Sequence, residues 1–169
     1  MYFREIETPI GTLIARADDH VLHSLLFQKS GYVPIRKSDT TITEYKIDEH
    51  PVLDALQLQL REYFKEGRTE FEIPMKPQGT DFQKTVWNAL LKIPYGITKT
   101  YLQQSESIGN VLAIRAVAAA NGKNPIAILI PCHRIIGTDG NLTGYSGGLW
   151  RKKFLLEKEG WSAAQPSLF

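Results

Sequence analysis

The sequence predicts an α+β protein in which a small sheet-and-helix domain precedes a mainly helical domain. Between residues 3 and 27, short apolar runs alternate with turn residues, which is typical of antiparallel strands. After residue 80, apolar residues recur mainly at helical spacing. Residues 72–79 contain two prolines and a glycine and indicate a linker, so we expect domains at residues 1–75 and 76–169.

Three strands are predicted at the start of the first domain. Residues 3–7 and 11–16 form a predicted hairpin, because the turn between them contains Pro9 and Gly11. Residues 21–27, which follow two aspartates, are the third predicted strand. We therefore expect an antiparallel sheet.

One amphipathic helix completes this domain. Residues 28–48 are polar and irregular, and residues 50–65 then place apolar side chains at helical spacing before Gly67. The apolar positions of this helix are Val52, Leu53, Leu56, Leu60, Tyr63 and Phe64.

The second domain is predicted to open with a helix that Thr80 caps and that the segment 94–96 ends. Its apolar face is predicted to hold Phe82, Val86, Leu90 and Leu91. Two short helices at about 101–107 and 112–121, with a glycine and an asparagine between them, have the spacing of a helix-turn-helix.

The rest of the domain consists of an apolar run, a loop and a last helix. Residues 126–130 are strongly apolar and directly precede the segment Pro131-Cys132-His133-Arg134. A glycine-rich loop at 137–148 leads to a helix at 149–159.

Composition excludes several classes of protein. With 43% hydrophobic residues among 169, the chain can bury a core, and one cysteine excludes an internal disulfide. Four scattered histidines and that cysteine lack the spacing of a structural zinc site, and no cofactor motif is present, so we expect neither metal nor cofactor. We find no apolar segment long enough to span a bilayer and no signal peptide, which predicts a cytoplasmic protein without membrane contact.

Charge points to the second half of the chain as the candidate surface for phosphates. The net charge is only +2, so a basic face must come from local clustering. The clustered cations after residue 90 are Lys92, Lys99, Arg115, Lys123, Arg134, Arg151, Lys152 and Lys153.

Cys132 is the main candidate for chemistry. It follows a buried apolar run and a proline, and the neighbouring His133 and Arg134 would favour a reactive thiolate by their positive potential. A lone cysteine after an apolar run also fits a small core residue, and adjacent Cys and His residues do not by themselves make a catalytic pair.

The residues around Cys132 match a family signature. Residues 124–137 read Asn-Pro-Ile-Ala-Ile-Leu-Ile-Pro-Cys-His-Arg-Ile-Ile-Gly, and residues 143–148 read Thr-Gly-Tyr-Ser-Gly-Gly. This pattern closely resembles that of the O6-alkylguanine-DNA alkyltransferases, also called methylated-DNA–protein-cysteine methyltransferases. The match continues over residues 80–160, whereas residues 1–75 match only in layout. The resemblance implies a ribonuclease-like first domain and a winged helix-turn-helix in the second.

The resemblance also implies roles in the reaction. Cys132 would accept the alkyl group, and His133 would remove the thiol proton through a water. Glu159 would orient that histidine, and Asn124 would hold the active-site turn. Such a relay is chemically sound, because the thiolate is the nucleophile and the imidazole must be held in one tautomer.

A second set of implied roles concerns the guanine. Tyr101 would meet guanine N3, the Tyr145 ring would pack against the base, and the Ser146 backbone N–H would reach O6. The carbonyls of Cys132 and Ile135 would accept from the exocyclic amine. Without the resemblance, Tyr101 is compatible with a core tyrosine, and the glycine-rich stretch with a flexible loop.

The remaining implied contacts are with DNA. Arg115 would enter the base stack where a flipped guanine has left, and further DNA contacts are implied at Asn110, Ala116, Ala119 and Arg134. The implied partner is double-stranded DNA, bound by a monomer through the minor groove without sequence preference. Taken alone, Arg115 is compatible with a solvated surface charge, and the alanines with a helix packing contact.

The chain departs from the family pattern at several positions. A Pro-Lys pair common in the helix-turn-helix turn is Val111-Leu112, and a small residue usual after the start of the Tyr101 helix is displaced to Gln104-Ser105. Ala127 replaces a proline found in some members, and Thr143 would line the entrance to the same alkyl-binding site. The first two changes concern groove geometry and DNA affinity, and the others concern tolerance for bulky alkyl groups.

The function we predict is DNA repair by a single transfer of an alkyl group from O6-alkylguanine, with O4-alkylthymine as a further candidate, to Cys132. Three rival functions remain open. A cysteine hydrolase would turn over repeatedly, and a transcription factor would show sequence preference and indifference to loss of Cys132. A damage sensor related to the family would bind alkylguanine without repairing it, but such members lack the acceptor cysteine.

Overall fold

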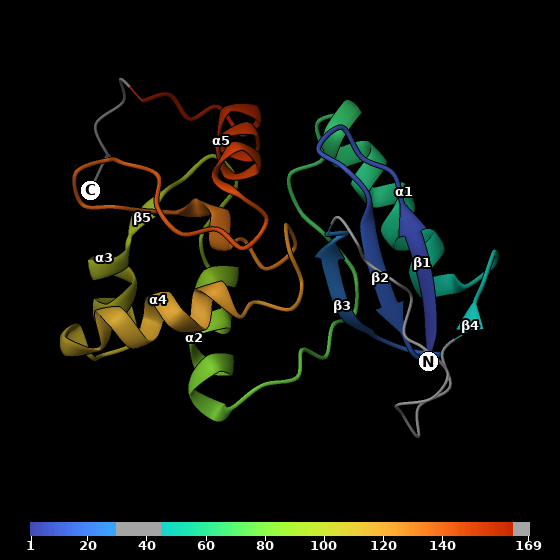
Figure 1. Ribbon diagram of the computed structural model, residues 1–169, viewed down its shortest axis with the longest axis horizontal. Helices are drawn as coiled ribbons and strands as arrows, with labels where there is room; N and C mark the ends of the chain where they lie inside the picture. The colour runs from blue at the N-terminus through green and yellow to red at the C-terminus, as the bar shows by residue number, and fades with distance from the viewer. Residues whose placement is uncertain (30–44, 164–169) are drawn as a thin grey trace. The chain divides into compact units, whose positions relative to one another are not determined.

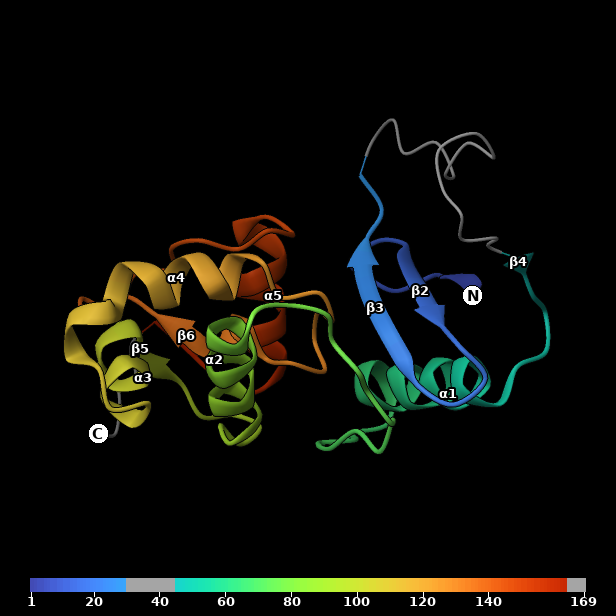
Figure 2. The ribbon, with the colours of Figure 1, turned by 90° about the horizontal axis from the view of Figure 1, so that it is seen from below.

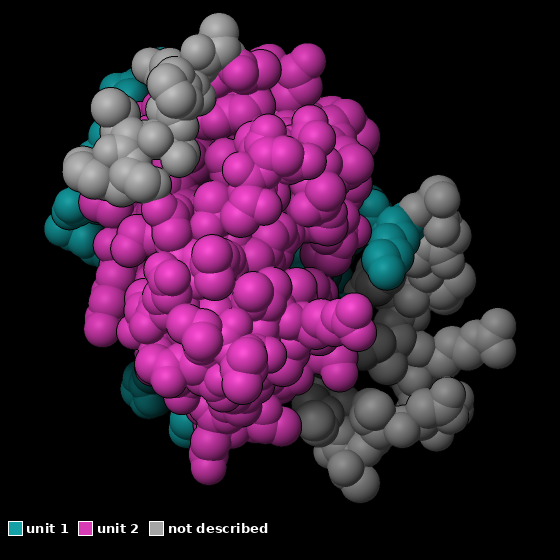
Figure 3. Space-filling model, turned by 90° about the vertical axis from the view of Figure 1, so that its left-hand side faces the viewer, with its two compact units in different colours: residues 1–78 teal, residues 79–169 magenta. Residues whose placement is uncertain are grey.

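The computed structural model describes residues 1–29 and 45–163, and these form two compact units, Met1–Gln78 and Gly79–Phe169. Figure 3 colours the two units separately. The sequence placed the boundary between residues 75 and 76, a few residues before this division. Within the described ranges, every helix is too short or too polar to span a membrane.

The first unit is built on a four-stranded sheet in the order β3-β2-β1-β4. The predicted antiparallel strands are β1 (Tyr2–Ile6), β2 (Leu13–Ala17) and β3 (Leu22–Phe27). Strand β4 (Tyr45–Lys46) was not predicted and pairs in parallel with β1. Most of the segment expected to be irregular, residues 30–44, lies outside the described residues.

Helix α1 (Pro51–Lys65) lies along one face of this sheet (Figures 1 and 2). Its start is fixed by the His50 side chain, which accepts from the Leu53 N–H, and by Pro51 in the first turn. Apolar residues of α1 and of the strands are fully buried together, among them Leu13, Leu22, Leu25, Leu53, Leu56 and Leu60. The predicted sheet-and-helix domain is therefore present.

Part of the predicted linker is bonded to the first unit. The Leu22 N–H donates to the Pro74 carbonyl at 2.8 Å, and the Lys76 N–H donates to the Leu22 carbonyl at 2.9 Å. These bonds pair Met75 with Leu22, the first residue of β3. The part of the linker that is not bonded to the sheet therefore begins after Lys76.

The second unit is mainly helical, and its first helix is α2 (Asp81–Leu91). The Thr80 side chain accepts from the Gln83 N–H, and the Gln83 side chain accepts from the Thr80 N–H. These two bonds form a complete capping box. The predicted apolar face is wrong at its ends, because Phe82 and Leu91 are exposed. Trp87 is buried instead and donates from Nε1 to the Ala120 carbonyl at 2.9 Å.

The helix-turn-helix consists of α3 (Tyr101–Ser107), the 3₁₀ helix η1 (Val111–Ala113) and α4 (Ile114–Gly122). Gly109 has φ of 78°, a left-handed conformation that permits the turn between them. Strand β5 (Lys99–Thr100) precedes α3 and pairs in parallel with β6 (Ile135–Ile136). The unit ends with α5 (Leu149–Lys158).

The apolar run at residues 126–130 forms a buried turn. Its five side chains are all buried, as predicted, and the Ile130 N–H bonds back to the Ile126 carbonyl. Ile128 has φ of 71°, the one positive value among the described residues other than glycine. A branched residue in that region is strained and is tolerated only where packing enforces it. The strained turn directly precedes the cysteine.

Candidate functional site

Cys132 begins the 3₁₀ helix η2 (Cys132–Arg134), and its side chain is buried. Asn124 holds both the thiol and the turn that carries it. Its Nδ2 donates to the Ile130 carbonyl at 2.7 Å and lies 3.2 Å from Cys132 Sγ, while its Oδ1 accepts from the Ile126 N–H. The expected role of Asn124 in holding the turn agrees with these contacts.

The resting form of Cys132 is a thiol. Burial raises its pKa, and the bond from Asn124 and the charge of Lys152 offset this only in part. The expectation that His133 and Arg134 favour a thiolate is therefore wrong. Burial keeps His133 neutral, and Arg134 is paired with Glu159.

His133 has a defined tautomer. Its side chain is fully buried, and Nε2 lies 2.9 Å from Glu159 Oε1. Burial lowers the pKa of His133 and outweighs the opposing effect of Glu159, so the imidazole is neutral at pH 7. Because Nε2 faces a carboxylate, it carries the proton, and Nδ1 is left as a buried lone pair without a hydrogen-bond partner among the described residues.

Glu159 is an ionised carboxylate at the end of α5. Burial alone would raise its pKa, but the bonds from His133 and Arg134 lower the pKa from 4.5 to about 2. Arg134 donates from Nε to Oε2 at 2.8 Å and from Nη2 to Oε1 at 3.0 Å. Glu159 thus fixes both basic neighbours of Cys132.

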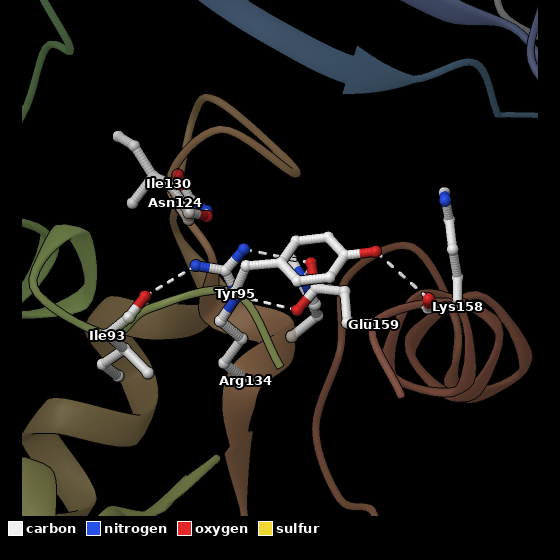
Figure 4. Close-up of polar contacts among 8 residues, drawn as sticks. Ile93, Tyr95, Asn124, Ile130, Arg134, Lys158 and Glu159 are labelled. Atoms are coloured by element: carbon white, nitrogen blue, oxygen red, sulfur yellow. Dashed lines mark hydrogen bonds and ion pairs between the residues drawn. The ribbon is translucent and has the colours of Figure 1, made fainter. Parts of the chain in front are cut away.

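Arg134 is buried, so its predicted contact with DNA is not supported. Besides the two bonds to Glu159, its Nη1 donates to the Ile93 carbonyl at 2.6 Å. Figure 4 shows the guanidinium between Ile93 and Glu159. The Tyr95 ring centroid lies 5.9 Å from the Arg134 Cζ atom. All three guanidinium nitrogens donate inside the protein.

A cavity of about 600 Å³ brings together four predicted site residues, namely Tyr101, Arg115, Tyr145 and Ser146. Its wall comes from α3, α4 and the loop after β6. Burial raises the pKa of Tyr101, so its hydroxyl stays protonated and donates to the Thr143 carbonyl at 3.0 Å. Cys132 and Ile135 are not part of this lining, and the Ile135 N–H donates to the Cys132 carbonyl.

Two cations that were predicted to contact phosphates donate hydrogen bonds to the loop of the cavity. Lys152 is fully buried and donates from Nζ to the Thr143 carbonyl at 2.8 Å, while Arg151 donates from Nη1 to the Gly147 carbonyl at 2.7 Å. Burial lowers the pKa of Lys152 to about 8. A sequence signal for Lys152 existed, because it shares a helical face with the buried residues Leu155, Leu156 and Glu159.

The alanine-rich helix has two different faces. Arg115, Ala116 and Ala119 are exposed, as a DNA-contacting surface requires, and Asn110 is exposed at the turn before them. Val117 and Ala120 are buried. The helix therefore has both a packing face and a free face lined by small side chains.

Among residues 1–29 and 45–163, no group of three or more histidine, cysteine, aspartate or glutamate side chains could hold a metal ion.

Two family models cover most of the chain. Residues 1–77 match the ribonuclease-like domain of 6-O-methylguanine DNA methyltransferase, and residues 81–161 match the DNA binding domain of the same family. The methylated-DNA–protein-cysteine methyltransferase of Methanosarcina acetivorans is 42% identical over 95% of this chain and 99% of its own length. That of Mycobacterium tuberculosis is 45% identical over 94% of this chain and 92% of its own length.

Solved structures agree with these matches. The crystal structure of the M. tuberculosis O6-methylguanine methyltransferase has a TM-score of 0.80 and 44% identity over 94% of this chain and 92% of that chain. The structure of M. tuberculosis OGT in complex with DNA has a TM-score of 0.81 and 42% identity over the same shares. The resemblance drawn from the signature around Cys132 is confirmed, and the chain belongs to the 6-O-methylguanine DNA methyltransferase family.

Proposed function

We propose that Cys132 is the acceptor in the DNA repair reaction of this methylated-DNA–protein-cysteine methyltransferase. The reaction needs a cysteine, and the chain contains only one. Sγ attacks the alkyl carbon, the bond between that carbon and guanine O6 breaks, and a thioether forms. The thiol proton leaves Sγ and a proton is taken up by the departing guanine, so the reaction needs no cofactor and yields unmodified guanine.

The observation that carries the proposal is the buried, neutral His133 with its free Nδ1. A protonated thiol is a poor nucleophile, so transfer needs a base close to Cys132. In our proposal, His133 Nδ1 accepts the thiol proton through a water, and the Glu159 carboxylate stabilises the imidazolium that forms. The 2.9 Å contact between Nε2 and Glu159 supports this order of transfer.

The cavity beside α3 and α4 is the proposed site of the flipped alkylguanine. Its volume of about 600 Å³ lies within the usual range for small-molecule sites. Tyr101 is suited to meet guanine N3, and Tyr145 and Ser146 to pack on the base and to donate to O6. The carbonyls of Cys132 and Ile135 would accept from the exocyclic amine, and O4-alkylthymine would enter the same way.

The free face of the helix-turn-helix is the proposed DNA surface. A base stacked in a duplex does not offer Cys132 the space for in-line attack, so the nucleotide must be flipped out. Arg115 would fill the gap from the minor groove, and Asn110, Ala116 and Ala119 would lie along the backbone. We propose a monomer that acts in the cytoplasm on double-stranded DNA without sequence preference.

The test is the intact mass of the protein after incubation with excess duplex DNA that contains O6-methylguanine. We expect a rapid burst that stops at about one methyl group per chain, located on the peptide that contains Cys132, because a thioether is a poor leaving group. Cys132→Ala should accept no methyl group yet still bind DNA. Turnover beyond one equivalent with Cys132 recovered free would instead support a hydrolase.

A further inference from the structure

Leu112 is the most exposed large apolar side chain in the described part of the protein, with 93% of its surface accessible. Its neighbour Val111 is 51% exposed. Both belong to η1, the turn that leads directly into α4. Adjacent apolar side chains that remain exposed indicate a contact surface more often than isolated ones.

Leu112 continues the free face of α4. At helical spacing, a side chain shares its face with those three, four and seven positions later, here Arg115, Ala116 and Ala119. All of these residues are exposed. Val111 and Leu112, here called the apolar tip, therefore lie at the N-terminal end of the exposed surface that carries Arg115.

The charges of this segment favour a polyanion as the occupant. Residues 111–122 contain one cation, Arg115, and no acidic residue. A cationic finger beside an apolar tip and small side chains fits a groove between phosphates, where the walls are negative and the floor consists of sugars and bases.

We propose that Leu112, supported by Val111, is an apolar wedge that enters the minor groove and contacts deoxyribose and base surfaces next to the flipped nucleotide. This inference rests on the proposed function. Three helical residues advance by roughly 4.5–6 Å, and successive base pairs by about 3.4 Å, so Leu112 meets the duplex one to two steps from Arg115. Leucine is among the side chains that proteins use as such wedges.

An apolar wedge has a distinct dependence on salt. A lysine that neutralises a phosphate releases counterions and steepens the plot of log K against log salt by about 0.9, whereas an apolar contact leaves the slope unchanged. Leu112 should therefore add affinity by the same factor at every salt concentration.

The experiment measures binding of a duplex with one O6-methylguanine and a flanking 2-aminopurine by anisotropy and fluorescence between 50 and 200 mM salt. All variants carry Cys132→Ala, so that no alkyl group moves during the titration. Leu112→Ala and Leu112→Lys are compared with Leu58→Ala, which removes a leucine that is 45% exposed on α1. Reaction of the corresponding Cys132 proteins with free O6-benzylguanine reports on the pocket.

We expect Leu112→Ala to weaken binding about tenfold at every salt concentration and to reduce the 2-aminopurine response. Leu112→Lys should steepen the salt slope by about 0.9, and Leu58→Ala should match the parent protein. The rate at which the Cys132 form of Leu112→Ala reacts with free O6-benzylguanine should change little. The tenfold effect should therefore be confined to the affinity for duplex DNA.

Unchanged affinity and an unchanged 2-aminopurine response for Leu112→Ala would overturn the wedge. If self-association measured by sedimentation were lost at the same time, a second copy of the chain would be the occupant instead. A flatter salt slope for Leu112→Ala would also contradict an apolar contact. Failure of the proposed function is a separate result, because the unmodified protein would then accept no alkyl group at all.

Discussion

Two buried amides join the helices of the helix-turn-helix, and their removal gives a quantitative prediction. Gln104 Nε2 donates to Asn121 Oδ1 at 3.0 Å, and Asn121 Nδ2 donates to Gln104 Oε1 at 2.7 Å. Gln104 lies one turn after Tyr101 on α3, and Asn121 lies near the end of α4, the helix of Arg115. The pair therefore connects the two helices that line the cavity.

Each single replacement by an apolar isostere strands a buried amide. A buried polar group without a partner costs about 1–3 kcal/mol, so Gln104→Met and Asn121→Leu should each lower the free energy of unfolding by about 2 kcal/mol. In the double variant both polar groups are gone, and the loss should stay below about 1 kcal/mol. The coupling energy between the two positions is then about 3 kcal/mol.

Urea unfolding of the four proteins measures this coupling, with tryptophan fluorescence as the signal because Trp87 packs against α4 through its bond to Ala120. Asn88→Leu is the matched control, since Asn88 is exposed on α2 and its loss should change stability by less than about 0.5 kcal/mol. If the double variant is as unstable as the sum of the single variants, the reasoning is refuted, because the two amides would then stabilise the protein independently.

Three further predictions concern the site. Glu159→Gln should slow alkyl transfer far more than DNA binding and should destabilise the protein by about 3–5 kcal/mol, since Arg134 loses its counter-charge. In the wild type, the folded pKa of about 2 lies below the ordinary 4.5, so about 3 kcal/mol of stability is present above pH 4.5 and lost as the pH falls through 2. Between pH 7 and pH 3, urea curves should show a loss of stability that is about 2 kcal/mol larger in the wild type than in Glu159→Gln, because pH 3 lies about 1.5 units below the ordinary pKa of 4.5. Arg115→Ala should slow repair of duplex DNA at least tenfold more than reaction with free O6-benzylguanine, whereas Lys152→Met, which frees the Thr143 loop, should slow both alike in single-turnover assays. Equal losses for Arg115→Ala on both substrates would place Arg115 in the pocket or the fold. The methylated protein should melt at a lower temperature than the fresh one in calorimetry, because an added methyl group in a packed site costs about 1–3 kcal/mol; an unchanged melting temperature would mean that the site has room for it.

Local signals explain what the sequence predicted well. The helix at residues 101–107 and the start of α2 at Thr80 were predicted correctly, because capping residues and apolar spacing act within one or two turns. The signature around Cys132 predicted the family for a similar reason, since its residues are contiguous. Strand β4 was missed because two residues that pair across more than 40 positions leave no local pattern.

Long-range pairing explains what the sequence could not predict. Arg134 and Lys152 were counted as surface cations, but Arg134 is buried against Glu159 and Lys152 against the Thr143 carbonyl. For Arg134, nothing in the local sequence distinguishes a paired buried cation from a solvated one, whereas the helical spacing of Lys152 with buried residues of the last helix did indicate burial. The amide pair of Gln104 and Asn121 was likewise out of reach, because polar residues on a helix favour solvent unless a partner from another helix meets them.

The resting state of Cys132 explains why a protein that reacts once would bury its nucleophile. A thiolate reacts with oxidants and binds metal ions, whereas a protonated, buried thiol reacts poorly with both. The burial that raises the pKa of Cys132 also keeps His133 neutral, so the proposed base can accept a proton and neither of these two side chains is charged at rest. The Glu159 carboxylate is held ionised by its bonds from His133 and Arg134, and its attraction for His133 becomes stronger once the imidazole is protonated. In the proposed mechanism, the relay would therefore stabilise the charge that develops during transfer more than it stabilises the resting site, and this difference would accelerate the reaction.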